Sequence, residues 1–146
     1  MGWVEDLHGK VVGLDTAPFI YYIEQNPACI DILGLFFEAV QRGEITLVTS
    51  IVTLVETLVL PVRRGDTKLA DQYRNMLFDT DNITTILLSQ EIAEEAAKLR
   101  ALHNFRSLDA IQMATAIDAS ASFFLTNDKQ FQRASAIQVL VLDDLK

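Results

Sequence analysis

The sequence predicts a three-layer α/β fold, in which a mainly parallel central sheet of about five strands lies between helices. Two observations predict it. Short runs rich in Val, Ile or Phe alternate with longer segments of helical periodicity, as in strands joined by crossover helices. The 146 residues are also 50% hydrophobic, which is enough for one buried core, so we expect a single domain over residues 1–146.

Five short segments are predicted to form the strands. Each is apolar and rich in β-branched residues or Phe. They cover residues 10–14, 45–49, 83–87, 122–125 and 137–141. Because helical segments separate most of them, the strands are expected to run mainly parallel and to be covered on both faces.

The first helices are predicted over residues 17–25 and 28–42. Pro27 separates them and suits the first turn of the second helix, which Gly43 closes. Ser50 is predicted to cap a third helix that runs to about Val59, and Pro61 with Gly65 should break it.

Three further helices are expected in the second half of the chain. A polar amphipathic helix is predicted over residues 66–78. Ser89 should cap the next helix, with Glu91 favourably placed in its first turn. Ser107 should cap a helix over residues 108–119, whose alanines would allow close packing on neighbouring elements.

The composition of the chain indicates its cellular compartment and limits the kinds of partner it can bind. Cys29 is the only cysteine, so no internal disulfide can form. The first ten residues contain acids and no long apolar run, unlike a signal peptide, and we expect a cytoplasmic protein. Glu56 and the pair Thr49 and Ser50 interrupt the longest apolar stretch, which favours a buried strand and helix over a membrane span. The net charge of −8 argues against a surface that attracts nucleic acid throughout.

Four acidic residues stand where apolar segments end or turn: Asp15, Glu56, Asp109 and Asp128. Moving an ionised carboxylate out of water without a charged or hydrogen-bonding partner costs on the order of several kcal/mol. In an open α/β sheet, ligands bind at the carboxyl ends of the strands, and each of these acids could lie at that end. A divalent metal ion would satisfy all four carboxylates.

Each acid also has a plainer interpretation. Asp109 near a helix N-terminus is favourable to the helix dipole, and Asp128 in the turn TNDKQ could simply start a short helix. Glu56 and Asp15 are harder to explain in this way, because apolar neighbours surround both in the sequence.

Other chemistries find little support in the sequence. Neither His8 nor His103 has a second histidine or a cysteine at zinc-ligand spacing. The motifs of nucleophilic serine enzymes, P-loop proteins and dinucleotide-binding proteins are absent from the sequence. Basic residues such as Arg106 and Lys129 could touch phosphates, although solvated helix ends are the commoner explanation.

Four segments together resemble the PIN-domain nucleases, and especially the VapC-like toxins of prokaryotic toxin-antitoxin pairs. They are LDTAPFIYYIE, SIVTLVETLV, SLDAIQMATAI and LTNDKQF, in that order along the chain. The resemblance implies a PIN-like fold, in which Asp15, Glu56, Asp109 and Asp128 form an acidic metal pocket that Thr126 and Asn127 support. Ala17 and Pro18 depart from the family's first motif, where Asn or Ser is common at the position of Ala17.

The resemblance also implies an activity and partners. We expect an endoribonuclease that hydrolyses RNA phosphodiester bonds, with an antitoxin protein and a second copy of the chain as partners. Hard oxygen ligands favour Mg²⁺ or Mn²⁺. Asp15 and Asp109 are expected to bind the metal directly, and Glu56 or Asp128 to orient the attacking water.

Two alternatives remain open from the sequence. A haloacid-dehalogenase-like phosphohydrolase would use Asp15 as its nucleophile, but it expects a second Asp two residues later, where this chain has Ala17. A catalytically silent PIN-like module would only bind a partner, and the intact set of acids is the contrary observation.

Overall fold

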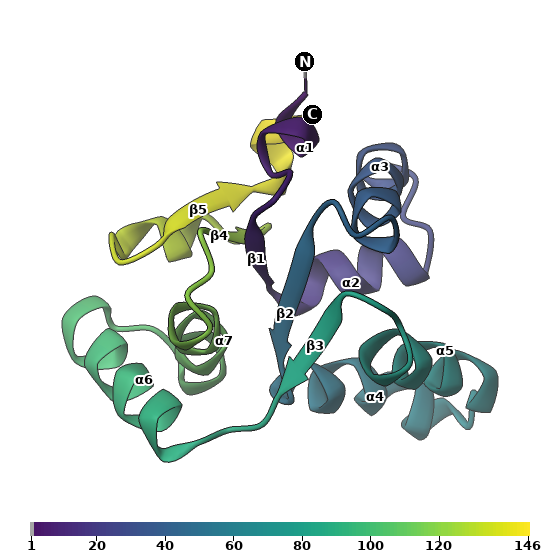
Figure 1. Cartoon of the computed structure of the whole chain (residues 1–146). Helices are drawn as coiled ribbons and strands as arrows, with labels where there is room; N and C mark the ends of the chain where they lie inside the picture. Colours follow the sequence, from purple (N-terminus) through teal and green to yellow (C-terminus); the bar gives the residue numbers. More distant parts are fainter. Residues whose placement is uncertain (1) are drawn as a thin grey trace.

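A computed structural model describes residues 2–146 and contains five parallel strands in one sheet, in the order β3-β2-β1-β4-β5 (Figure 1). The strands are β1 (Val11–Leu14), β2 (Thr46–Ser50), β3 (Ile83–Ile86), β4 (Phe123–Thr126) and β5 (Gln138–Val141). The predicted α/β fold with a parallel sheet is therefore confirmed, and each predicted strand differs from the observed one by no more than one residue at either end.

Seven α-helices and two short 3₁₀ helices are described around the sheet. They are α1 (Trp3–Asp6), α2 (Thr16–Ile23), α3 (Ile30–Gln41), α4 (Val52–Arg64), α5 (Thr67–Phe78), α6 (Gln90–His103), α7 (Ser107–Asp118), η1 (Lys129–Arg133) and η2 (Leu142–Leu145). Figure 1 shows α6 and α7 on one side of the sheet and α2 to α5 on the other. Within residues 2–146, every helix is too short or too polar to cross a membrane.

Two apolar cores form on the two faces of the sheet. One joins α2, α3 and α5 to the sheet and includes Leu125, whereas the other joins α6, α7 and η1 and includes Phe124. Successive side chains of a strand point to opposite faces, so these neighbouring residues of β4 enter different cores. This arrangement explains why the central strand β1 is apolar throughout instead of alternating with polar residues.

Some helix boundaries differ from the predicted ones. Pro61 lies inside α4 instead of ending it, and the helix continues to Arg64 although the proline removes one backbone donor and crowds the preceding turn. Gly65 ends α4 in the left-handed region, at a φ of 67°, where it donates to Val62 O. Ser107 does not cap α7: Arg106 occupies the N-cap position, and the Ser107 hydroxyl accepts a hydrogen bond from Arg100.

The starts of two other helices also differ from the prediction. Ser50 is the last residue of β2, and Ile51 precedes α4 in the cap position, although Ser50 Oγ does accept from Val52 N at 3.1 Å. Pro27 lies in the turn before α3, which begins at Ile30. In contrast, the predicted cap at Ser89 is confirmed, since its hydroxyl accepts from Ile92 N at 3.1 Å.

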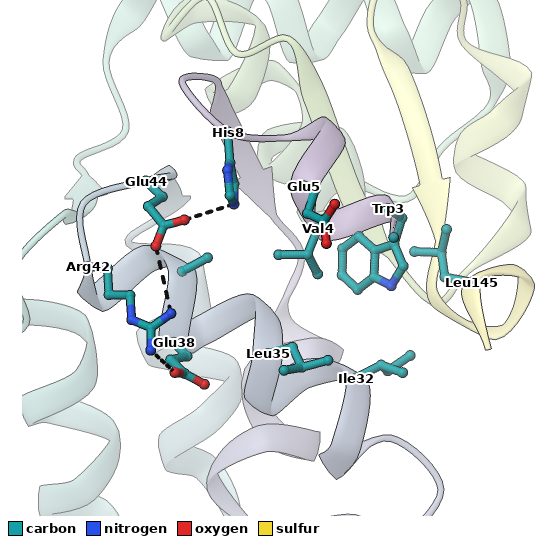
Figure 2. Close-up of a pocket in the computed structure, with 12 residues that line it drawn as sticks. Trp3, Val4, Glu5, His8, Ile32, Leu35, Glu38, Arg42, Glu44 and Leu145 are labelled. Carbon is teal, nitrogen blue, oxygen red and sulfur yellow. Dashed lines mark ion pairs between the residues drawn. The ribbon is translucent and has the colours of Figure 1, made fainter.

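A hollow of about 420 Å³ lies between α1 and α3, near the amino ends of the strands (Figure 2). Trp3 stacks on Phe36 beside it, with ring centroids 5.7 Å apart. His8 Nε2 lies 2.9 Å from Glu44 Oε2 at its polar end. None of the four candidate acids lines this hollow, so it is separate from the predicted site.

Gly13 allows α7 to lie close against β1. A Cβ atom at this position would overlap Ala116 Cβ of α7 and would lie 3.2 Å from the Phe124 ring. The small residues predicted for close packing in α7 thus meet a glycine in the central strand.

Replacing Gly13 with Ala should therefore destabilise the protein, by roughly 1–3 kcal/mol as is typical of overpacking. Gly34→Ala is the matched control, because no atom lies within 4 Å of a Cβ at that helical position. Alanine there should be neutral or stabilising by up to about 1 kcal/mol. Urea unfolding midpoints would measure both changes, and equal stability of Gly13→Ala and the parent would contradict the close contact.

Candidate active site

Asp15 lies at the junction between β1 and α2, at the carboxyl end of the central strand. Its backbone N–H donates to Leu125 O at 3.0 Å, which continues the pairing of β1 with β4 by one residue. Its carboxylate accepts from Thr16 N and from Thr126 Oγ1, each at 2.8 Å. The residue is only 9% exposed, so these two donors replace much of its hydration.

Ionisation of the Asp15 carboxylate is unfavourable in the folded chain. Burial is the main cause that raises its pKa from an ordinary 3.8 to about 6, and the two hydrogen bonds oppose this rise. The negative charges of Asp109 and Glu56 raise the pKa further. These three acids therefore stand close enough for their charges to interact.

Glu56 lies on α4, and its carboxylate contacts Thr16 of α2, the residue that follows Asp15. Thr16 Oγ1 donates to Glu56 Oε1 at 2.6 Å, and Gln112 Nε2 of α7 lies 3.4 Å from the same oxygen. Gln112 Nε2 also donates to Thr16 Oγ1 and to Thr53 Oγ1, each at 2.8 Å. One polar cluster, formed by Thr16, Thr53, Glu56 and Gln112, thus joins α2, α4 and α7.

Asp109 lies in the first turn of α7, as predicted, and pairs with Arg106. Arg106 Nε donates to Asp109 Oδ2 at 3.1 Å, while the Arg106 side chain remains 84% exposed. The pKa of Arg106 is raised, first by Asp109 and to a smaller extent by the charges of Asp128 and Glu56. This guanidinium therefore faces three of the four candidate acids from the solvent side, and it lines a small pocket of about 160 Å³ with Glu56, Ser107 and Leu108.

Asp128 starts the short helix η1, which confirms the plainer interpretation of its position. Its Oδ1 accepts from Gln130 N at 2.9 Å. Its own N–H donates to Thr126 Oγ1 at 3.0 Å, and Thr126 donates in turn to Asp15. Thr126 thus contacts Asp15 directly, whereas Asn127 accepts from Asp143 N at 3.0 Å and contacts η2 instead.

The structure thus places Asp15 and Asp128 just after β1 and β4, Glu56 in the helix that follows β2, and Asp109 in the first turn of α7, which precedes β4. Their oxygen atoms are the ligands that Mg²⁺ and Mn²⁺ prefer. Among the described residues, no three acidic, histidine or cysteine side chains already form a cage for a metal ion. Asp109 is turned toward Arg106 and Asp128 toward the backbone of η1, so the site fits a divalent cation in its donors and charge but is not a preformed cage.

The sequence interpretation missed the polar residues that hold the acids. Gln112 is only 2% exposed and joins three helices. It stands one helical turn after Asp109 in a run of otherwise small or apolar residues, AIQMATA, and a polar residue on that buried face was the available signal. Thr53 likewise faces the buried side of α4 one turn before Thr57.

Comparison with solved structures shows the same fold in several toxin-antitoxin proteins. A chain of VapBC2 from Rickettsia felis, bound to a DNA fragment from its promoter, has a TM-score of 0.73 at 17% identity and covers 90% of this chain and 98% of its own. VapC20 from Mycobacterium tuberculosis, described as a sarcin-ricin loop cleaving toxin, has a TM-score of 0.68 at 16% identity, over 86% of this chain and 95% of its own. VapBC-1 from nontypeable Haemophilus influenzae has a TM-score of 0.68 at 18% identity, over 91% and 98%.

Sequence comparisons give the family. No curated protein matches the chain. The family model of the PIN domain matches residues 12–137, a span that contains all four candidate acids. The chain therefore belongs to the PIN domain family.

Proposed function

We propose that this protein is a divalent-metal-dependent endoribonuclease that hydrolyses RNA phosphodiester bonds and acts as the toxin of a toxin-antitoxin pair. The observation that carries this proposal is a buried carboxylate, Asp15, placed near Asp109 and Glu56, whose negative charges add to the rise in its pKa. Membership in the PIN domain family favours it over a haloacid-dehalogenase-like phosphohydrolase with Asp15 as nucleophile.

In this proposal Asp15 and Asp109 bind the cation directly, with Glu56 and Asp128 completing the acidic set. A bound Mg²⁺ or Mn²⁺ would supply a water of lowered pKa and offset the charge that develops on the phosphoryl oxygens. Asp15 suits direct binding because Thr16 and Thr126 fix both of its oxygens. Asp109 suits it because its present partner, Arg106, is an exposed side chain that can move away.

The protein's side chains would perform the other steps of hydrolysis. Glu56 or Asp128 accepts the proton of the attacking water, whose oxygen forms the new bond to phosphorus while the bond to the leaving sugar oxygen breaks. Arg106 binds a phosphate oxygen of the RNA strand, because a guanidinium matches phosphate geometry and this one is exposed at the edge of the acids. With a net charge of −8, the protein needs such local cations to hold RNA.

The proposed partners follow from the same family. The solved structures that share the fold include a toxin-antitoxin complex from Klebsiella pneumoniae, with a TM-score of 0.65 and 21% identity. We infer that this chain too binds a small antitoxin that covers the acidic site, that it pairs as a homodimer, and that it acts in the cytoplasm, where its RNA substrate would be.

The first test is cleavage of a mixed RNA pool that includes structured tRNA, by the purified chain with Mn²⁺, with Mg²⁺ or with EDTA. The parent should cut only with metal, and Asp15→Asn should lose at least about a hundredfold in rate because a ligand is removed. Gel electrophoresis of the products measures both.

Asp118→Asn is the matched control, since Asp118 is exposed at the other end of α7 from Asp109. It should cleave like the parent. Equal cleavage by Asp15→Asn and the parent would overturn the assignment of the site. Absence of metal binding together with absence of cleavage in the parent would favour a silent binding module.

Without metal, Asp15→Asn should be more stable than the parent above about pH 6. The folded chain holds the Asp15 proton more tightly than the unfolded chain, because the pKa is about 6 instead of 3.8. The parent therefore loses stability as the pH rises from about 4 to about 6, and this loss persists at neutral pH. The shift corresponds to on the order of 3 kcal/mol at most.

Asparagine does not titrate, so thermal unfolding in EDTA should show the advantage of Asp15→Asn growing from about pH 4 to about pH 6 and levelling off by about pH 7. A constant difference across this range would mean that the ionisation of Asp15 does not limit stability. Asp118→Asn again serves as the control, because Asp118 is exposed at the other end of α7 from Asp109.

Arg106→Ala should raise the KM for RNA by roughly tenfold and lower the slope of log affinity against log salt by about one, as expected for one lost phosphate contact. Arg106→Lys should recover part of the binding, because it keeps the charge but not the planar fork. Arg74→Ala is the control, since Arg74 lies on α5 and pairs with Asp71. An unchanged salt slope in Arg106→Ala would exclude the phosphate contact.

A further inference from the structure

We infer that Gln112 is a positioning residue that fixes Glu56, so that Oε1 is held inside the protein and Oε2 is left for a divalent cation. This inference rests on the proposed function, because it assigns a role to Gln112 only if Glu56 belongs to a metal site. It goes beyond that function in naming a residue that bears no charge and that would not itself touch the metal.

The first support is that every protein donor to Glu56 reaches the same oxygen. Thr16 Oγ1 donates to Oε1 at 2.6 Å, and Gln112 Nε2 approaches it at 3.4 Å. Among residues 2–146, no side chain or backbone group donates to Oε2. The two oxygens of this carboxylate therefore have different surroundings.

The second support is the direction of each hydrogen bond in the cluster. Thr49 Oγ1 donates its only proton to Leu14 O at 3.0 Å, so at the 2.9 Å contact between Thr49 and Thr53 the proton comes from Thr53. Thr16 likewise gives its proton to Glu56. Both Thr16 and Thr53 have then used their protons, and each can only accept from Gln112 Nε2, at 2.8 Å.

This proton count also fixes the orientation of the Gln112 amide. If the amide were rotated by half a turn, its oxygen would face two hydroxyls without free protons and the Glu56 carboxylate. The observed orientation instead turns the amide N–H groups toward acceptors only, namely Thr16 Oγ1, Thr53 Oγ1 and, at a longer distance, Glu56 Oε1. The hydrogen bonds that link Leu14 O to Glu56 Oε1 thus have one consistent set of directions, in which Gln112 donates to both Thr16 and Thr53.

The third support is that this arrangement is not optimal for Gln112 itself. Its Oε1 is buried and has no hydrogen-bond partner within the described part of the chain. A buried acceptor without a partner lowers stability, and an apolar side chain of similar length would avoid that loss. The amide is therefore better explained by what its N–H groups hold in place than by a contribution to the core.

The test measures binding of Mn²⁺ alone by calorimetry, without RNA, to the parent and to Gln112→Met. Methionine has a similar length and no donor, and it also removes the unpartnered oxygen. We expect Mn²⁺ binding to weaken by roughly tenfold, as for other residues that orient metal ligands. The thermal midpoint without metal should fall by no more than that of Thr115→Val, the control on the same buried helix, whose hydroxyl donates only to Ile111 O.

A double-variant cycle shows whether Gln112 acts through Glu56. Glu56→Gln alone should weaken Mn²⁺ binding, and adding Gln112→Met to it should weaken binding little further. A purely structural role would instead reduce binding equally in both backgrounds, and that result would overturn the inference, as would parental Mn²⁺ affinity in Gln112→Met.

Thr16 offers a second route if Gln112→Met does not fold. Thr16→Val removes the donor to Glu56 Oε1 at nearly constant shape and should weaken Mn²⁺ binding, whereas Thr16→Ser keeps the hydroxyl and should preserve it. Equal Mn²⁺ affinity of the two variants would contradict the inference. Failure of the parent to bind Mn²⁺ at all would instead contradict the proposed metal-dependent function.

Discussion

The hydrogen bonds that the Gln112 amide donates hold together the helices on or beside which three of the candidate acids lie. They join α7 to α2 and α4, across separations of 96 and 59 residues in the sequence. Each of these helices also carries or follows one of the acids that interact electrostatically, Asp109, Asp15 and Glu56. Because a buried amide and hydroxyl cluster is favourable only when its members are mutually paired, the helices cannot shift independently.

The sheet brings these helices together through close packing at its centre. Gly13 in β1 leaves room for Ala116 of α7, so the helix approaches the central strand closely. The β1–β4 pairing then places Asp15 beside Thr126, whose hydroxyl donates to Asp15 and accepts from the backbone of Asp128. The geometry of the site is in this way a consequence of strand register and of one small residue in the core.

The same geometry brings several negative charges close together, and their repulsion lowers the stability of the folded protein. Burial raises the pKa of Asp15, and the neighbouring acids raise it further, so the ionised form is disfavoured without a compensating cation. Arg106 supplies one positive charge at the exposed edge, and hydrogen bonds offset part of the desolvation of Asp15. The two cores of the protein are apolar. Repulsion between acids that is confined to one end of the sheet is typical of a functional site.

The sequence by itself determined the strands, their mainly parallel direction and the four acids at the places where apolar segments end or turn, because periodicity and residue type are local properties. It did not determine the end of α4, where Pro61 is tolerated, or the cap of α7, where Arg106 takes the place expected for Ser107. It also did not reveal the contact of Arg106 with Asp109, although these residues are only three positions apart. Only the tertiary structure decided the hydrogen bonds of Gln112, because contacts between side chains on separate helices depend on packing and leave no periodic signal in the chain.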